Sequence, residues 1–341
     1  VVATQGRSFW ILDDVTPLRQ MADSVASADR FLFQPRPAFR AGMGGFRGAG
    51  ISGPPGPAVF DYYLSGKVQD TLRLEILDAD GNVVRTFESG KAEGGEASEE
   101  ESFFGGGRDR PLPSGKGMHR YTWNLRLQGV DKPEDAVVWG YTGGPTIVPG
   151  TYTARLSAGD WSAERKLEVR PDPRWQGVSH QDLVDQLHMA TAVRDTLQGV
   201  YDAIRALRSS RKQVKAAAER AEAAGADGEV AARADSLTAR MTELEGELMQ
   251  TRNESGQDPI RFPPQFDNQV AALYGNVAGP DGAPTRGARE RWQDLLSQWK
   301  EFRGRLDGLL KDDLGAFNQL LQQQNVPAVV VPKGSAGGNG S

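Results

Sequence analysis

The hydrophobic period of this chain changes at Pro171-Asp172-Pro173-Arg174. Before this point apolar and polar residues alternate in short runs bounded by Gly and Pro, which is the pattern of half-buried strands. After it apolar residues recur every three or four positions over long stretches, which is the pattern of amphipathic helices. Proline has no amide to donate to a strand ladder, so these prolines end the last strand. The sequence therefore predicts a multidomain chain, β first and then α.

The clearest strand pattern lies between Gly117 and Arg170. Its first half offers Met118, Tyr121 and Trp123 for burial. Upstream, the Asp-Gly turn within 78–82 separates two alternating runs, which is a strong hairpin signal. Together with the runs at 59–64, 150–156 and 161–170, this gives about six or seven strands, the number of an Ig-like antiparallel β-sandwich.

The sequence after Arg174 predicts an antiparallel three-helix bundle, because long amphipathic segments follow one another with short breaks. The predicted helices cover 179–224, 230–248 and a long segment from Thr285, with a short helix at 266–274. Ser179 and Asp182 form a variant of the capping box at the start of the first predicted helix. Trp292 and Trp299 lie seven residues apart on one face of the last predicted helix. Their expected role is in the bundle core, and the alternative is a groove that binds a partner protein.

Five regions follow from these patterns. We expect a strand pair at 1–14, a short helix capped by Thr16 and a Gly/Pro-rich linker at 15–57, and the β-sandwich at 58–170. The helical bundle would occupy 171–327, and a Gly/Ser-rich disordered tail would occupy 328–341.

Composition narrows the function. The formal net charge of −5 argues against a nucleic-acid binder, which usually carries a basic surplus. No apolar run approaches the roughly 20 residues of a membrane span. The chain has no cysteine, so disulfide and thiolate chemistry are excluded.

The sequence predicts no catalytic residue, no cofactor and no metal ligand. His180 and His188 are eight apart and do not form a helical zinc pair, and His119 is expected to point outward from a strand. The Gly-rich run at 42–50 lacks phosphate-loop spacing. The acidic run Glu99–Glu101 is expected to be solvated, with a calcium site as the alternative.

Two further patterns have alternative interpretations. Trp123, Tyr152 and Trp161 could form an aromatic carbohydrate platform, although aromatic residues at strand spacing are more often core. Arg205, Arg208 and Arg211 begin a basic face on the first long helix, opposite Glu243, Glu245 and Glu247, and a solvated surface is the expected role.

The opening segment VVATQGRSFWILDDVTPLRQ resembles the closing part of the last blade in bacterial BNR-repeat, sortilin-like β-propellers, often labelled glycosyl-hydrolase or sialidase-like. The resemblance continues through Asp61-Tyr62-Tyr63-Leu64, the Trp123 motif, Pro149-Gly150-Thr151-Tyr152 and Asp172-Pro173-Arg174. The run LDADGNVVRTF resembles the Ig-like domain of flagellar hook-capping proteins.

The resemblance implies the C-terminal accessory region of an exported, secreted or periplasmic propeller protein, and we expect this chain to be the end of a longer one. It implies a non-catalytic role, packing against the missing propeller or a partner protein. The alternatives are a supporting part of a glycosidase-like hydrolase, with Asp13-Asp14 as the nearest carboxylates, and a carbohydrate-binding module.

Phe9, Trp10 and Ile11 mark the expected docking segment. Consecutive large apolar residues put side chains on both faces of a strand, so both faces need cover. The sequence therefore predicts that this segment packs onto the missing partner.

Overall fold

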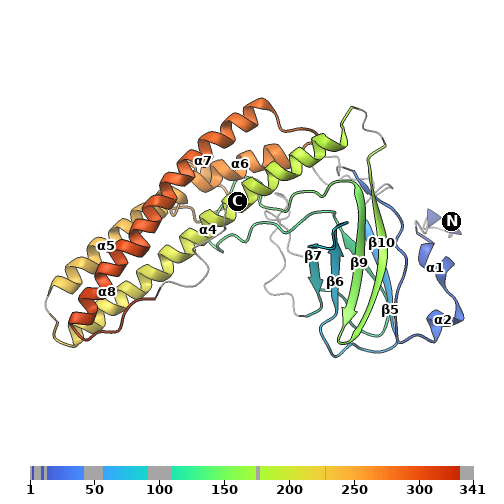
Figure 1. The fold of residues 1–341 in the computed structure, drawn as a ribbon, viewed down its shortest axis with the longest axis horizontal. Helices are drawn as coiled ribbons and strands as arrows, with labels where there is room; N and C mark the ends of the chain where they lie inside the picture. Colours follow the sequence, from blue (N-terminus) through green and yellow to red (C-terminus); the bar gives the residue numbers. More distant parts are fainter. Residues whose placement is uncertain are drawn as a thin grey trace. The chain divides into compact units, whose positions relative to one another are not determined.

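The computed structural model describes residues 2–3, 9–10, 14–41, 57–90, 110–173, 177–226 and 228–330. The chain forms two compact units. The β unit takes residues 1–97, 107–128 and 146–184, and the helical unit takes 98–106, 129–145 and 185–341. The prediction of β structure followed by helices is therefore confirmed (Figure 1).

The β unit contains two sheets and a separate strand pair among its described residues. The five-stranded sheet has the order β4-β10-β9-β6-β7, and its strands are β4 (Ala38–Arg40), β10 (Trp161–Pro171), β9 (Gly150–Ala158), β6 (Arg73–Leu77) and β7 (Val83–Glu88). The three-stranded sheet consists of β3 (Arg30–Leu32), β5 (Ala58–Leu64) and β8 (Gly117–Trp123). In the separate pair, β1 (Val2–Ala3) lies antiparallel to β2 (Phe9–Trp10).

The predicted hairpin around the Asp-Gly turn is confirmed. Strands β6 and β7 pair antiparallel, and Asp78 Oδ1 accepts hydrogen bonds from the amides of Asp80 and Asn82. Gly81 has a φ of 84°, which explains why glycine follows the aspartate.

Both sheets contribute to one core. The alternating residues Leu74, Ile76, Ala154 and Leu156 of the larger sheet are fully buried with residues of the smaller sheet. Trp123 is only 2% exposed, and its ring centroid lies 6.4 Å from that of Phe87 on β7. The prediction that Trp123 is a core residue is confirmed.

The expected linker at 15–57 is wrong for its described part, because β3 and β4 belong to the two sheets. Strand β3 pairs with β5, and β4 pairs parallel with the end of β10. Each is three residues long and flanked by prolines or loops, so neither has a periodic signature. The residues from 42 to 56 lie outside the described part of the chain.

The short helix predicted after Thr16 is divided into α1 (Thr16–Gln20) and α2 (Asp23–Ala26). Thr16 is not its cap. The Thr16 amide donates to Asp14 Oδ1 at 2.9 Å, so Asp14 provides the capping carboxylate, with Pro17 in the first turn.

The helical unit follows the predicted periodicity closely. Its helices are α4 (His180–Ala223), α5 (Gly228–Leu248), α6 (Phe266–Ala278), α7 (Arg286–Asp307) and α8 (Leu314–Gln323), with a π-helical turn, η2 (Gly308–Asp313), between α7 and α8. The capping box is present, because the Ser179 amide donates to Asp182 Oδ2 at 2.8 Å and the Asp182 amide donates to Ser179 Oγ.

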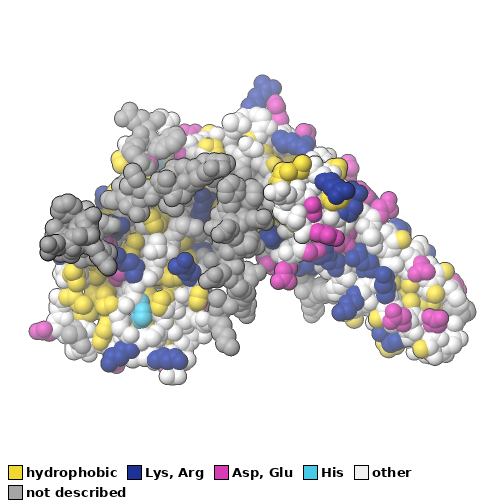
Figure 2. Space-filling view, turned by 180° about the vertical axis from the view of Figure 1, so that it is seen from behind, with side chains coloured by type: hydrophobic (Ala, Val, Ile, Leu, Met, Phe, Trp, Pro, Cys, Tyr) yellow, Lys and Arg dark blue, Asp and Glu magenta, His cyan; other side chains and the backbone are white. Residues whose placement is uncertain are grey.

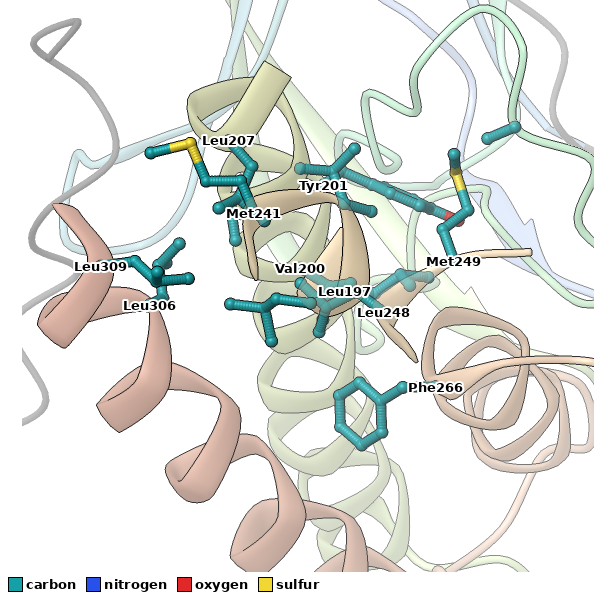
Figure 3. Close-up of a cluster of buried hydrophobic side chains, with 14 of the residues drawn as sticks. Leu197, Val200, Tyr201, Leu207, Met241, Leu248, Met249, Phe266, Leu306 and Leu309 are labelled. Atoms are coloured by element: carbon teal, nitrogen blue, oxygen red, sulfur yellow. The ribbon is translucent and has the colours of Figure 1, made fainter. Parts of the chain in front are cut away.

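One apolar cluster joins these helices. Leu197 and Val200 from α4, Leu248 from α5 and Leu306 from α7 are buried together (Figure 3). Trp292 is 9% exposed and belongs to this cluster, so its predicted core role is confirmed. Trp299 is half-buried and stacks on Phe266 with 6.1 Å between ring centroids.

The residues from 129 to 145, here called the inserted segment, connect β8 to β9 but belong to the helical unit. Their ends meet, since the Val130 amide donates to the Thr142 carbonyl at 2.8 Å. A Cβ at Gly140 would lie 2.6 Å from the Cβ of Ala271 on α6, so only glycine permits this close approach. The segment contains no helix or strand, but it belongs to the helical unit and not to the region 58–170 in which the sequence placed the sandwich.

Candidate functional site

One row of side chains crosses the three-stranded sheet on the face away from the core. The register aligns Phe31 with Tyr63 and Tyr63 with Met118. Phe31 and Tyr63 are half-buried, and Met118 is 43% exposed. We call this row, together with α1, the outer face.

Four charged side chains connect α1 to the outer face; we call them the Asp14 cluster. Arg120 on β8 forms two hydrogen bonds to Asp61 on β5, at 2.8 and 3.1 Å. Asp14 lies 3.6 Å from Arg36 and 3.9 Å from Arg120. Both carboxylates are buried, at 7% and 8% exposure, so two arginines compensate two buried acids.

The electrostatics of the Asp14 cluster favour the ionised acid. Burial alone would raise the pKa of Asp14, but hydrogen bonds from Thr16 and the charges of Arg36 and Arg120 outweigh it, and the pKa lies below its usual value. The hydrogen bond to Asp61 raises the pKa of Arg120. The arrangement binds residues 14–20 to the sheet and leaves no free carboxylate in this cluster for acid–base chemistry.

Large apolar side chains remain exposed at the outer face. Leu18 on α1 is 58% exposed, and Met21, directly after α1, is 48% exposed. Figure 2 shows hydrophobic side chains gathered on the β unit, with charged side chains among them. Exposed methionine and leucine beside half-buried aromatic residues are typical of protein-binding surfaces.

The residues considered for an aromatic platform are not brought together. Trp123 is buried, and its Nε1 donates to the Arg126 carbonyl at 2.8 Å. Tyr152 pairs with Leu167 at one end of the β9–β10 hairpin, whereas Trp161 pairs with Ala158 at the other end. A platform of all three is therefore excluded.

The expected docking segment falls partly within the described residues. Phe9 and Trp10 form β2, which pairs with β1 and with no other described strand. Ile11 and Asp13 lie outside the described residues, as do the run Glu99–Glu101 and the Gly-rich run at 42–50. Asp14 accepts the Thr16 amide at the start of α1.

The histidines are not grouped, and the described residues contain no cluster of His, Asp or Glu placed to hold a metal ion. His180 and His188 are exposed on α4. His119 does not point outward as expected. It pairs with Tyr62 and lies on the face of β8 that also carries Tyr121 and Trp123, with its ring 5.3 Å from the Tyr62 ring.

The basic face of α4 is less solvated than expected. Glu245 on α5 is only 3% exposed and accepts from Arg208 at 2.6 Å and from Arg211. Arg208 also forms two hydrogen bonds to Asp135 of the inserted segment, and this pairing lowers the pKa of Asp135. These charges therefore join α4, α5 and the inserted segment.

Sequence reasoning missed two polar centres. The Asp61–Arg120 pair had a signal, because both residues occupy outward positions of strands that the sequence predicted. The second centre, Asp267 on α6, is fully buried and has no arginine or lysine partner among the described residues. No short motif marks it, because an acidic residue in a first helical turn is ordinarily solvated.

The chain matches no family model, no curated protein and no solved structure in comparisons with each. Among the described helices, none combines the length and the apolar character needed to cross a bilayer.

Proposed function

We propose that this chain is a non-catalytic accessory region that packs against a β-structured partner protein. The docking side is the outer face together with the β1–β2 pair. The resemblance to BNR-repeat propellers gives the class of partner, a β-propeller, and gives an exported, secreted or periplasmic setting.

The observation that carries this proposal is the isolation of β1 and β2. Their register joins Val2 to Trp10 and Ala3 to Phe9, and neither strand pairs with another described strand. A lone two-stranded ribbon is marginal in water, and its open edges offer amides and carbonyls to another sheet. A partner sheet would stabilise the two-stranded ribbon and would supply hydrogen-bond partners for its open edges.

The same proposal includes the finer fold classes. The β unit is taken as an Ig-like sandwich, because its two sheets share one core across the contact of Phe87 with Tyr121, with ring centroids 4.9 Å apart. The helical unit is taken as an antiparallel three-helix bundle in which α7, η2 and α8 together form the third member. Accessory regions of this kind present a rigid surface rather than a reactive group.

Deletion of residues 1–13 tests the proposal. The structure sets this boundary, because Asp14 must remain to cap α1 and to pair with Arg36 and Arg120. Without its partner, the full chain should self-associate through the open ribbon and the outer face. In sedimentation velocity the deletion should lower this association.

A surface variant gives a matched comparison. Met118→Ser on the outer face should also lower self-association, whereas Ile260→Ser, at a position 75% exposed in the helical unit, should leave it unchanged. If neither the deletion nor Met118→Ser changes the sedimentation profile, the proposed docking side is wrong.

A further inference from the structure

Asp267 lies in the first turn of α6 and is 0% exposed. Its Oδ1 accepts hydrogen bonds from the amide of Asn268 at 2.7 Å and from the Asn268 side chain at 3.2 Å. Its Oδ2 has no hydrogen-bond partner. Among the described residues no cation forms an ion pair with it, so its ionised form is poorly compensated.

A second buried polar group faces it. Tyr201 on α4 is 0% exposed, and its hydroxyl also lacks a hydrogen-bond partner. In Figure 3 the Tyr201 ring extends toward Met249, with its hydroxyl oxygen at the edge of the apolar cluster. The carboxyl of Asp267 and the hydroxyl of Tyr201 interact electrostatically, and each is held in an apolar surrounding.

The residue after Asp267 holds the inserted segment. Asn268 Oδ1 accepts from the Trp139 amide at 2.8 Å, and its Nδ2 donates to the Val137 carbonyl. Two further bonds from α6 continue this contact. The Ala271 carbonyl accepts from the Tyr141 amide, and the Tyr274 hydroxyl donates to the Gly143 carbonyl at 2.6 Å.

We propose that Asp267 is a proton-controlled latch for the inserted segment. With the carboxyl protonated, the first turn of α6 stays packed against α4, and Asn268 holds the segment. When the carboxyl loses its proton, a buried charge without a cation forms at this turn. Water entry relieves it, and the turn and the bonds that Asn268 makes to the segment open together.

The pH range follows from the surroundings. Burial raises the pKa of Asp267 to about 7, although the hydrogen bonds from Asn268 and the proximity of the Tyr201 hydroxyl act in the opposite direction. The described part of the segment nearest to it, Val137 to Trp139, offers only backbone groups and no titratable side chain. The closed state therefore loses stability as the pH rises from the ordinary range of an aspartate to about 7.

The other charges around the segment are paired with one another. Arg205 lies one turn from Tyr201 and is engaged by Asp131 and Asp202, at 2.9 and 3.0 Å. Arg208 is engaged by Asp135, whose pKa is lowered, and by Glu245 on α5. These pairs anchor the segment at points separate from Asn268.

A single cysteine provides the test, because the chain has none. Ala136 of the inserted segment is 4% exposed, so a thiol at Ala136→Cys reacts with iodoacetamide only when the segment opens. The reaction rate of Ala136→Cys is measured in a chain with no other change and in a chain that also carries Asp267→Asn. The asparagine keeps the shape of the aspartate side chain and cannot ionise. The ratio of the two rates cancels the titration of the thiol. It should already exceed one at pH 6, because the released carboxyl is ionised there, and should rise by a further factor of about ten by pH 8, where it levels off.

A second thiol separates release of the segment from unfolding of the whole unit. Ala217 on α4 is 0% exposed, and Ala217→Cys reacts only on global opening. At pH 8 the thiol at position 136 should react at least about tenfold faster than that at position 217, because local opening costs less than global unfolding. Equal rates at the two positions, or a ratio that stays constant with pH, would overturn the latch.

Tyr201→Phe provides an independent variant if Asp267→Asn does not fold. Removing the hydroxyl takes away an interaction that favours the ionised carboxyl, so the midpoint of the labelling transition should move to higher pH. A midpoint that stays at its original value would also overturn the proposal.

Discussion

In each unit a buried aspartate helps to hold a segment that is distant in the sequence. The two aspartates differ in their surroundings, because only one of them lies beside positive charges. In the β unit Asp14 is buried beside Arg36 and Arg120, and its pKa lies below the usual value. In the helical unit Asp267 is buried without a cation among the described residues, and its pKa rises to about 7. Burial acts in the same direction on both, so the arginines make the difference.

The difference gives the two units opposite responses to pH. A lowered folded-state pKa contributes stability above the unfolded value, and this contribution is lost as the pH falls through the folded value. A raised folded-state pKa contributes stability at low pH, and this contribution is lost as the pH rises toward that value. Acid therefore weakens the attachment of α1, whereas neutral and alkaline pH weaken the helical unit.

The largest expected effect tests whether the units are independent. Trp123→Ala should destabilise the β unit by about 3–5 kcal/mol, because the change leaves a large cavity in its shared core. Hydrogen exchange followed by mass spectrometry should show lost protection in β6 and β9 and unchanged protection in α4. A loss below about 1 kcal/mol, measured by urea unfolding, would mean that Trp123 is not a core residue.

The next effect tests the uncompensated acid. At pH 8 Asp267→Asn should stabilise the helical unit by about 2–4 kcal/mol, because it removes the cost of a buried charge whose pKa is shifted by about three units. The gain should shrink as the pH falls from about 7 to 4 and vanish near roughly pH 3, where the carboxyl is protonated in both the folded and the unfolded state. Urea unfolding followed by circular dichroism at 222 nm measures both values, and a gain that does not depend on pH would rule out this explanation.

A smaller effect of opposite sign is expected for Asp14, whose charge is compensated by two arginines. Asp14→Asn should cost the β unit about 1 kcal/mol at pH 7, because the amide retains the cap but loses the attraction of Arg36 and Arg120. The cost should shrink as the pH falls through the lowered pKa of Asp14, because the native carboxyl then becomes protonated too. Asp23→Asn, on the exposed start of α2, serves as the control and should have little effect at either pH.

The smallest expected effect concerns the strand pair. Deletion of residues 1–13 should change the thermal midpoints of both units by no more than about 1 °C, because β1 and β2 pair with no other described strand. In the full chain the amides of β2 should exchange far faster than those of β6. Protection equal to that of β6 would place the ribbon within the β unit.

The sequence predicted the helices well because each buries one face, and burial of one face fixes the apolar period. The same holds for β6, β7, β9 and β10, whose alternation matches their burial. Strands β3 and β4 were missed because three residues cannot display a period. Their pairing also depends on partners distant in sequence, as with Ala38 beside Val169.

The candidate sites were harder to predict. A helix start at Thr16 and Pro17 was expected, but the cap was assigned to Thr16, and the pairing of Asp14 with Arg120 depends on tertiary structure. Asp267 gave no signal, because its burial results from the inserted segment, and that segment has no regular structure. Glycine at positions 129 and 140 was the available clue, since both allow backbone to approach closely.

The docking of the inserted segment has a consequence for synthesis on the ribosome. Trp139 and its partner Asn268 are 129 positions apart. At about 5–20 residues per second, roughly 6–26 s pass between the synthesis of the two residues. During this interval α4 is made and can pair with Asp131 and Asp135, but the part of the segment that bonds to α6, from Val137 to Tyr141, has no partner from that helix. The β unit can complete its hairpins in that time, so the nascent chain carries a half-docked segment that a chaperone can recognise until α6 is made.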